Sequence, residues 1–147
     1  LIRQEIEHHN IPFELLNKIR SGEDYVNEKG EYIKNEILTT KNSPPHSYAF
    51  CSDTEYDTSL SRKIKNVDLL YHEATFMNEQ KDRASKTKHS TTIQAATIAK
   101  NANASNLMIG HYSRRYNDIN KLKIESQTIF KRTFLSKSGM EIDFKNL

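Results

Sequence analysis

The spacing of apolar and polar residues differs between residues 1–46 and the rest of the chain. Over residues 1–20 the apolar side chains recur at helical intervals and a Ser-Gly pair follows, which predicts two short helices. Residues 25–38 alternate weakly around a Lys-Gly pair, which predicts a hairpin or a surface loop. Residues 39–46 contain two prolines and predict a loop, because proline lacks a donor and restricts the residue before it.

From residue 48 onward, short apolar runs alternate with helical periodicity. Strands are expected at residues 48–51, 67–71, 107–110 and 140–144. Helices are expected at residues 57–64, 90–102 and 119–134. Either Ser90 or Thr91 is expected to be the N-cap of the middle helix. This alternation is typical of layered α/β packing.

Residues able to carry chemistry stand where these apolar runs end. Asp53 and His111 each follow a predicted strand, His89 precedes a predicted helix, and a His72-Glu73 pair follows another strand. Ligands in α/β enzymes gather outside the carboxyl ends of the strands. We therefore expect these groups to converge on one metal-dependent hydrolytic site.

The residue types suggest a division of roles. Carboxylates and imidazoles are zinc ligands, so Asp53 and His111 are the candidate metal ligands. A Glu-His pair is an acid/base unit in which the carboxylate orients the ring, and Glu73 with His89 fits that description. Taken alone, Asp53 could be a turn residue or helix cap, and His111 could be a structural histidine. The His72-Glu73 pair could also be the polar end of a strand, and this is the interpretation that we favour for His72.

Length and composition limit the number of domains and the cellular compartment that we expect. With 147 residues, 35% of them hydrophobic, the chain can form at most one domain of ordinary size. It starts at Leu1 in a helical pattern without signal-peptide features, so we expect a piece of a longer protein. No apolar run approaches the ~20 residues needed to cross a bilayer, and the single Cys51 favours the cytosol.

The net charge is too small to identify a polyanionic partner. It is +3, from 22 Lys and Arg against 19 Asp and Glu. Basic residues do collect near the candidate site, within residues 81–89 and at Arg114 and Arg115. They would suit contacts with phosphates, although such runs are also common on plain solvated faces.

Four motifs together resemble a known family. They are Ser-Asp-Thr at residues 52–54, His-Glu-Ala-Thr at 72–75, His-Ser-Thr at 89–91 and Gly-His-Tyr-Ser-Arg-Arg-Tyr at 110–116. In this order and approximate spacing they resemble the C-terminal half of ribonuclease Z, the tRNA 3′-processing endonuclease. The resemblance implies an α/β fold that is the C-terminal half of a metallo-β-lactamase-type αββα sandwich, a mixed sheet with flanking helices. Residues 1–147 would form a single portion of that domain.

The resemblance also assigns roles to the site residues. Asp53 matches the aspartate that bridges two zinc ions, and His111 matches a histidine ligand of one of them. Glu73 and His89 match the pair credited with proton transfer during cleavage. The implied activity is zinc-dependent phosphodiester hydrolysis that removes the 3′ trailer from precursor tRNA and leaves a tRNA 3′-hydroxyl. The implied protein is a cytoplasmic enzyme, usually a homodimer.

The motif at residues 110–116 extends the resemblance, whereas another motif of the family is absent from this sequence. Ser113 and Arg115 fall where RNA phosphates would approach, and Tyr112 replaces the usual phenylalanine. The family's main metal motif, His-x-His-x-Asp-His, does not occur in this sequence. We therefore expect that the N-terminal half is missing and that the chain alone is inactive.

Two other functions fit part of this pattern. Another metallo-β-lactamase-fold phosphodiesterase, acting on a small or cyclic phosphodiester, could share the aspartate and the histidine at residues 53 and 111. A non-catalytic RNA-binding half could keep the same residues without a metal. The combination of His-Glu-Ala-Thr with His-Ser-Thr favours the tRNA enzyme over the first alternative.

Overall fold

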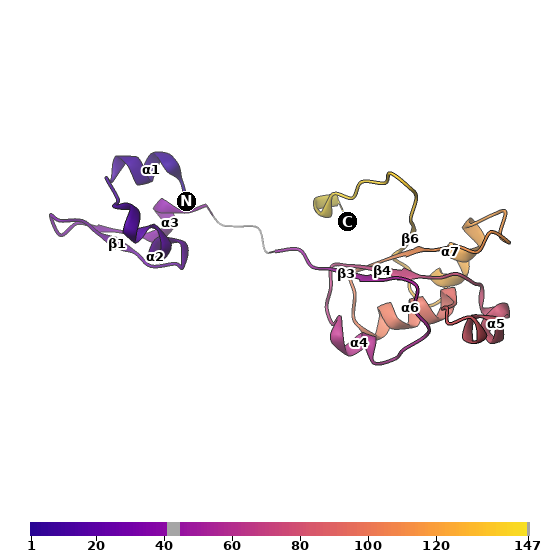
Figure 1. The fold of residues 1–147 in the computed structure, drawn as a ribbon. Coiled ribbons are helices and arrows are strands. Elements are labelled where there is room, and N and C mark those ends of the chain that lie inside the picture. Colours follow the sequence, from indigo (N-terminus) through magenta and orange to yellow (C-terminus); the bar gives the residue numbers. More distant parts are fainter. Residues whose placement is uncertain (41–44, 147) are drawn as a thin grey trace. The chain divides into compact units, whose positions relative to one another are not determined.

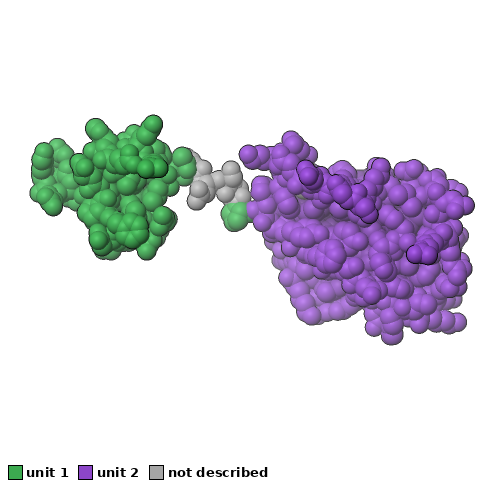
Figure 2. Space-filling model, turned by 45° about the horizontal axis from the view of Figure 1, so that its top comes forward, with its two compact units in different colours: residues 1–45 green, residues 46–147 purple. Residues whose placement is uncertain are grey.

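The computed structural model describes residues 1–40 and 45–146, which cluster in two compact units. Unit 1 comprises Leu1–Pro45 and unit 2 comprises His46–Leu147, coloured green and purple in Figure 2. Part of the loop predicted at residues 39–46, namely residues 41–44, lies outside the described residues. That residues 1–147 form one portion of a single domain stays a prediction, and each unit is described by itself.

Unit 1 combines short helices with a hairpin. Its elements in chain order are α1 (Arg3–His8), η1 (Phe13–Leu15), α2 (Leu16–Arg20), β1 (Tyr25–Val26), β2 (Tyr32–Ile33) and α3 (Asn35–Leu38). Strands β1 and β2 pair antiparallel, so the hairpin rather than the surface loop is confirmed. Helices α1 and α2 confirm the two predicted helices, whereas α3 was not predicted. A small core forms from Ile11, Ile19, Tyr25, Ile33 and Leu38.

Unit 2 is built on a four-stranded sheet in the order β3-β4-β5-β6. Its strands are β3 (Tyr48–Cys51), β4 (Leu69–Glu73), β5 (Asn106–Gly110) and β6 (Thr133–Leu135). All three pairings are parallel, whereas we expected a mixed sheet. The register places Cys51 beside His72 and Glu73 beside Gly110. Because the strands are parallel, the carboxyl ends of β3, β4 and β5 meet at one edge.

A layer of helices covers one face of this sheet. The helices of that layer are α4 (Leu60–Lys63), α6 (Thr92–Asn101) and α7 (Asn120–Gln127). Unit 2 also contains α5 (Lys81–Lys86) and the short 3-10 turns η2 (Asn78–Gln80) and η3 (Phe144–Asn146). Figure 1 shows α4 and α6 on the same side of the sheet. Residues such as Leu70, Ile98, Leu107 and Ile109 form the core between them. One sheet with one helical layer is half of an αββα arrangement, and the α/β class is confirmed.

Helix α6 begins where the sequence allowed either of two caps. Thr91 is the N-cap, because its Oγ1 accepts a hydrogen bond from the Gln94 N–H at 3.3 Å. The Gln94 side chain in turn accepts from the Thr91 N–H at 2.8 Å, which completes a capping box. This start matters for function because His89 lies just before it.

Three predicted elements differ from the structure. The helix expected to reach residue 134 ends at Gln127, because Thr133–Leu135 pairs with β5 as strand β6. Pairing with a neighbouring strand thus overrides helical periodicity there. The helix expected at residues 57–64 is reduced to α4, and no strand forms at residues 140–144. That segment alternates in hydrophobicity but pairs with no strand among the described residues.

The other face of the sheet carries aromatic side chains. Tyr48 and Phe50 are 53% and 63% exposed there, and the Phe50 ring stacks on Tyr71 with centroids 4.6 Å apart.

Within the described residues, no helix combines the length and apolar character that a membrane crossing requires.

Candidate functional site

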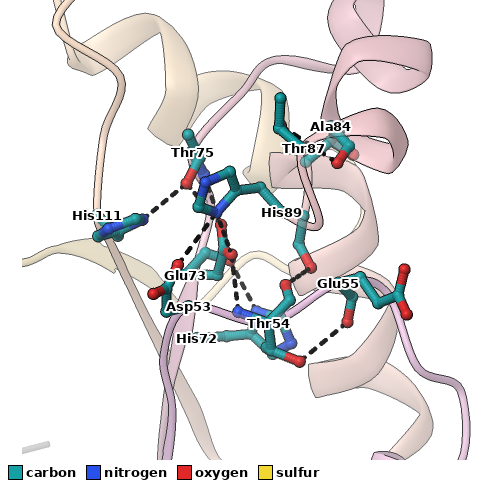
Figure 3. Close-up of polar contacts among 12 residues, drawn as sticks. Asp53, Thr54, Glu55, His72, Glu73, Thr75, Ala84, Thr87, His89 and His111 are labelled. Carbon is teal, nitrogen blue, oxygen red and sulfur yellow. Dashed lines mark hydrogen bonds and ion pairs between the residues drawn. The ribbon is translucent and has the colours of Figure 1, made fainter.

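Four of the predicted site residues meet at the carboxyl edge of the sheet. Asp53, Glu73, His89 and His111 each offer one ligand atom, and these atoms lie within 4.8 Å of one another. Figure 3 shows their side chains converging from separate segments. Asp53 follows β3, Glu73 ends β4, His89 precedes α6 and His111 follows β5. The four groups are therefore close enough to act in one site.

Unusual backbone angles place three of these side chains. Asp53 and His111 have positive φ angles of 51° and 61°, and Lys88, just before His89, has 61°. Left-handed backbone costs a non-glycine residue roughly 1–2 kcal/mol, less for Asp, so it persists where surrounding contacts impose it. The chain thereby turns sharply as β3 and β5 end.

The Glu73 carboxylate is fully buried and fully engaged. Its Oε1 accepts from the Thr54 N–H at 2.9 Å and from His89 Nδ1 at 2.9 Å. Its Oε2 accepts from the Thr75 N–H at 3.2 Å and from the Thr75 hydroxyl at 2.6 Å. Four donors occupy the lone pairs of a carboxylate, so none is left for a metal ion. Glu73 is thus an orienting group rather than a ligand.

His89 is held on one side of its ring. Its Nδ1 bonds Glu73 and also lies 3.5 Å from Asp53 Oδ1. The backbone N–H donates to the Ala84 carbonyl at 2.8 Å, and the ring stands edge-on to Phe76. With Nδ1 engaged by a carboxylate, Nε2 is the nitrogen that can exchange a proton with a substrate.

Asp53 and His111 form the open part of the cluster. The Asp53 side chain is 74% exposed and His111 is also exposed. His111 Nδ1 lies 2.8 Å from the Thr75 hydroxyl oxygen, and its ring centroid lies 5.2 Å from that of His89. A carboxylate oxygen and an imidazole nitrogen are donors that suit zinc. The cluster therefore fits metal binding, and Asp53 and His111 are its most exposed members. Their assignment as the metal ligands stays a prediction.

The loop after His111 is hydrogen-bonded to the segment that contains Thr75. The Ser113 N–H donates to the Thr75 carbonyl at 3.1 Å, and the Ser113 carbonyl accepts from the Tyr116 N–H at 3.1 Å. Arg115 is exposed, and the structure does not bring it or Ser113 into the four-residue cluster. Their assignment to RNA phosphates stays a prediction.

Tyr112 uses the hydroxyl that phenylalanine lacks. The hydroxyl donates to the Ile109 carbonyl and accepts from the Ser136 N–H at 3.0 Å. Burial raises the pKa of this phenol, so it stays protonated and able to donate. The tyrosine hydroxyl thus links the end of β5 to the residue that follows β6.

The basic residues near the site are partly engaged. The Lys88 ammonium pairs with Glu55 at 2.8 Å, and the Arg83 guanidinium lies over the Phe76 ring at 5.9 Å from its centroid. These contacts join the segment before His89 to the rest of the site. Contacts of these residues with phosphate stay a prediction.

Residue-by-residue reasoning overlooked Thr54 and Thr75 and gave His72 no role beyond the polar end of a strand. Thr54 and Thr75 donate to Glu73, and His72 is fully buried with Nδ1 2.7 Å from the Glu73 carbonyl oxygen. Burial lowers the pKa of His72 and favours its neutral form. The only available signal was that all three residues stand inside the motifs at residues 52–54 and 72–75.

No family model matches the chain. Ribonuclease Z of Porphyromonas gingivalis (strain W83) is 49% identical over 137 residues, 93% of this chain and 45% of that protein. Ribonuclease Z of Bacteroides thetaiotaomicron is 42% identical over 146 residues, 99% of this chain and 46% of that protein. The chain spans about half the length of the curated relatives that it matches.

Solved structures support the same fold. The metallo-β-lactamase fold protein YhfI from Bacillus subtilis superimposes with a TM-score of 0.61 at 27% identity, over 67% of this chain and 40% of that one. A long form RNase Z from yeast gives 0.59 at 27% identity, over 68% of this chain and 14% of that one. The parallel sheet with its helical layer is therefore part of a metallo-β-lactamase fold.

Proposed function

Because this chain is homologous to ribonuclease Z over most of its length, we propose that the protein carrying it is a tRNA 3′-processing endoribonuclease. Its substrate is precursor tRNA, and its product is tRNA with a 3′-hydroxyl. The main support is the cluster of Asp53, Glu73, His89 and His111, because it joins two metal-type donors to an oriented acid/base pair.

The metal is zinc, held in part by the open side of the cluster. Asp53 and His111 would hold this metal, and the remaining ligands would come from outside this chain. Zinc bound here polarises the phosphoryl oxygens and lowers the pKa of water. Two ligands are fewer than the three protein donors of typical catalytic zinc sites. The chain alone is therefore inactive.

His89 supplies the proton that the leaving group needs. Water attacks the phosphorus after the discriminator nucleotide, and its oxygen forms the new bond while the bond to the 3′-oxygen breaks. His89 protonates that 3′-oxygen, the attacking water releases one proton to solvent, and His89 regains a proton from solvent, so the net reaction consumes one water molecule. Glu73 orients the imidazole through Nδ1 and stabilises its protonated form.

The surface residues and the setting complete the proposal. Ser113 and Arg115 contact RNA phosphates, because a guanidinium can bind two phosphate oxygens at once. The enzyme acts in the cytoplasm as a homodimer.

The test uses the full-length protein that carries this chain and a precursor tRNA with a 3′ trailer. His89→Ala should lower turnover about 10²–10⁴-fold with unchanged zinc content, because one proton donor is lost. The matched control is His8→Ala, an exposed residue of unit 1. Unchanged turnover in His89→Ala with full zinc content would show that the acid is assigned wrongly.

The same preparation separates the alternatives. Cleavage of a small or cyclic phosphodiester without cleavage of precursor tRNA would favour the other phosphodiesterases of this fold. Binding of precursor tRNA without cleavage, in a protein lacking metal, would favour the non-catalytic RNA-binding role.

A further inference from the structure

A single hydroxyl group joins the two parts of the cluster. Thr75 Oγ1 lies 2.6 Å from Glu73 Oε2 and 2.8 Å from His111 Nδ1. Figure 3 draws the contact between Thr75 and His111 as a dashed line. Thr75 is buried, so these two neighbours rather than water determine where its hydroxyl proton points. A hydroxyl has only one proton to donate.

The carboxylate determines which neighbour receives that proton. Glu73 is an acceptor in all four of its side-chain contacts, so the Thr75 O–H must point toward Oε2. If it pointed to His111 instead, two oxygens would face each other at 2.6 Å without a proton between them. Thr75 Oγ1 is then left as an acceptor, and His111 Nδ1 must carry the proton of their 2.8 Å bond.

The backbone around Thr75 gives this hydroxyl a defined position. The Thr75 N–H donates to Glu73 Oε2 at 3.2 Å, and the Thr75 carbonyl accepts from the Ser113 N–H at 3.1 Å. The preceding Ala74 N–H donates to the Gly110 carbonyl at 2.9 Å. The segments on both sides of His111 are therefore tied to the segment that carries Thr75. A β-branched side chain also has few rotamers in which to move.

We propose that Thr75 is a positioning residue that holds His111 as the Nδ1–H tautomer and leaves Nε2 with its lone pair. The same hydroxyl couples this metal ligand to the Glu73–His89 proton-transfer pair. The part that concerns metal rests on the proposed function, whereas the tautomer is a property of the metal-free protein. Partners that orient metal-ligating histidines typically change metal affinity 10–100-fold.

The decisive variants are Thr75→Val and Thr75→Ser. Valine matches threonine in shape but has no hydroxyl, so it removes both side-chain bonds of Thr75, while serine keeps the hydroxyl. The matched control is Thr87→Val, because the exposed Thr87 hydroxyl donates to the Arg83 carbonyl and does not touch the cluster.

The first measurement needs neither metal nor RNA. The full-length protein is labelled with ¹⁵N-histidine, stripped of metal and studied by long-range ¹H–¹⁵N correlation at alkaline pH, where imidazole rings are neutral. His111 should be the Nδ1–H tautomer in the wild type and in Thr75→Ser, and a mixture in Thr75→Val. A wild-type protein with Nε2–H at His111 would overturn the proposal even if Thr75→Val failed to fold.

The second measurement is zinc titration of the same proteins. The Kd should rise about 10–100-fold in Thr75→Val and stay near wild type in Thr75→Ser and Thr87→Val. Wild-type affinity and an unchanged tautomer in a folded Thr75→Val would also overturn the proposal. If the tautomers are as expected but precursor tRNA is not cleaved, the proposed function fails and the assignment of Thr75 stands.

Discussion

The cluster at the edge of the sheet has a buried part and an exposed part. Glu73 and Thr75 are buried, and protein groups provide the hydrogen-bond partners of both side chains. Asp53 and His111 are exposed and keep atoms free for a ligand. We therefore expect the buried residues to maintain the structure of the site and the exposed residues to bind its ligand. Variants in the buried part should therefore lower stability, and variants in the exposed part should lower binding.

The largest loss of stability is expected for Glu73→Gln. An amide replaces one acceptor oxygen by a donor, so it faces the donors of Thr54, Thr75 or His89 without a partner. Each buried donor left unpaired costs about 1–3 kcal/mol, so we expect a loss of about 3 kcal/mol in unfolding free energy. Denaturant unfolding measures it, with the exposed Glu79→Gln as control. A loss like that of the control would contradict the role of Glu73 in building the site.

Gly110→Ala should have the next largest effect, although it adjoins the exposed His111. An added Cβ would lie 2.5 Å from Ser136 Oγ and 2.7 Å from Tyr71 Cε2, and still closer to the Tyr71 hydroxyl. Overpacking of this kind costs about 2 kcal/mol. Thermal and denaturant unfolding would show it, and Tyr71→Phe in the same background should recover part of the loss. No recovery would mean that the two positions are not coupled.

A pH-dependent loss is expected from His72, next to the buried carboxylate. Burial lowers the pKa of His72 below its ordinary value of 6.5, so the unfolded chain binds its proton first as pH falls. This contribution is complete above pH 6.5 and declines below it, by at most about 1.4 kcal/mol per pH unit. Unfolding free energies measured between neutral and mildly acidic pH should decline less steeply in His72→Asn. The slope should be unaltered in His8→Ala, and equal slopes in all three proteins would refute the assignment.

The smallest change in stability is expected for Asp53→Asn. The side chain is 74% exposed, and asparagine tolerates the positive φ of 51° at this position. Unfolding free energy should stay within about 0.5 kcal/mol of wild type. Zinc affinity should fall at least about tenfold, because an amide oxygen replaces a charged ligand. A stability loss as large as that of Glu73→Gln would remove the distinction between the two parts of the cluster.

The fold could be predicted where local pattern and global pairing agree. Strand β3 was expected at its observed bounds, and α6 was expected within two residues of its observed bounds. The long helix expected at residues 119–134 was wrong in its second half, because β6 gains hydrogen bonds from β5 that no local pattern reveals. The strand predicted at residues 140–144 was wrong for the opposite reason. This segment alternates in hydrophobicity but has no partner strand among the described residues.

The site could be predicted to the level of its charged groups. Asp53, Glu73, His89 and His111 were identified from their positions at the ends of apolar runs, and the structure places them together. Their roles stay predictions. Thr54 and Thr75 were not identified, because threonines are common and their contribution depends on which atoms of Glu73 they reach.

The sequence alone was enough to predict strands whose carboxyl ends lead to Asp53, Glu73 and His111, since parallel pairing brings such ends to one edge. Three-dimensional packing was needed to distinguish the buried carboxylate from the exposed one. Glu73 and Asp53 are both acidic residues at strand ends, but only Glu73 is surrounded by four donors. Those donors come from residues 54, 75 and 89, and only folding brings them around a single side chain.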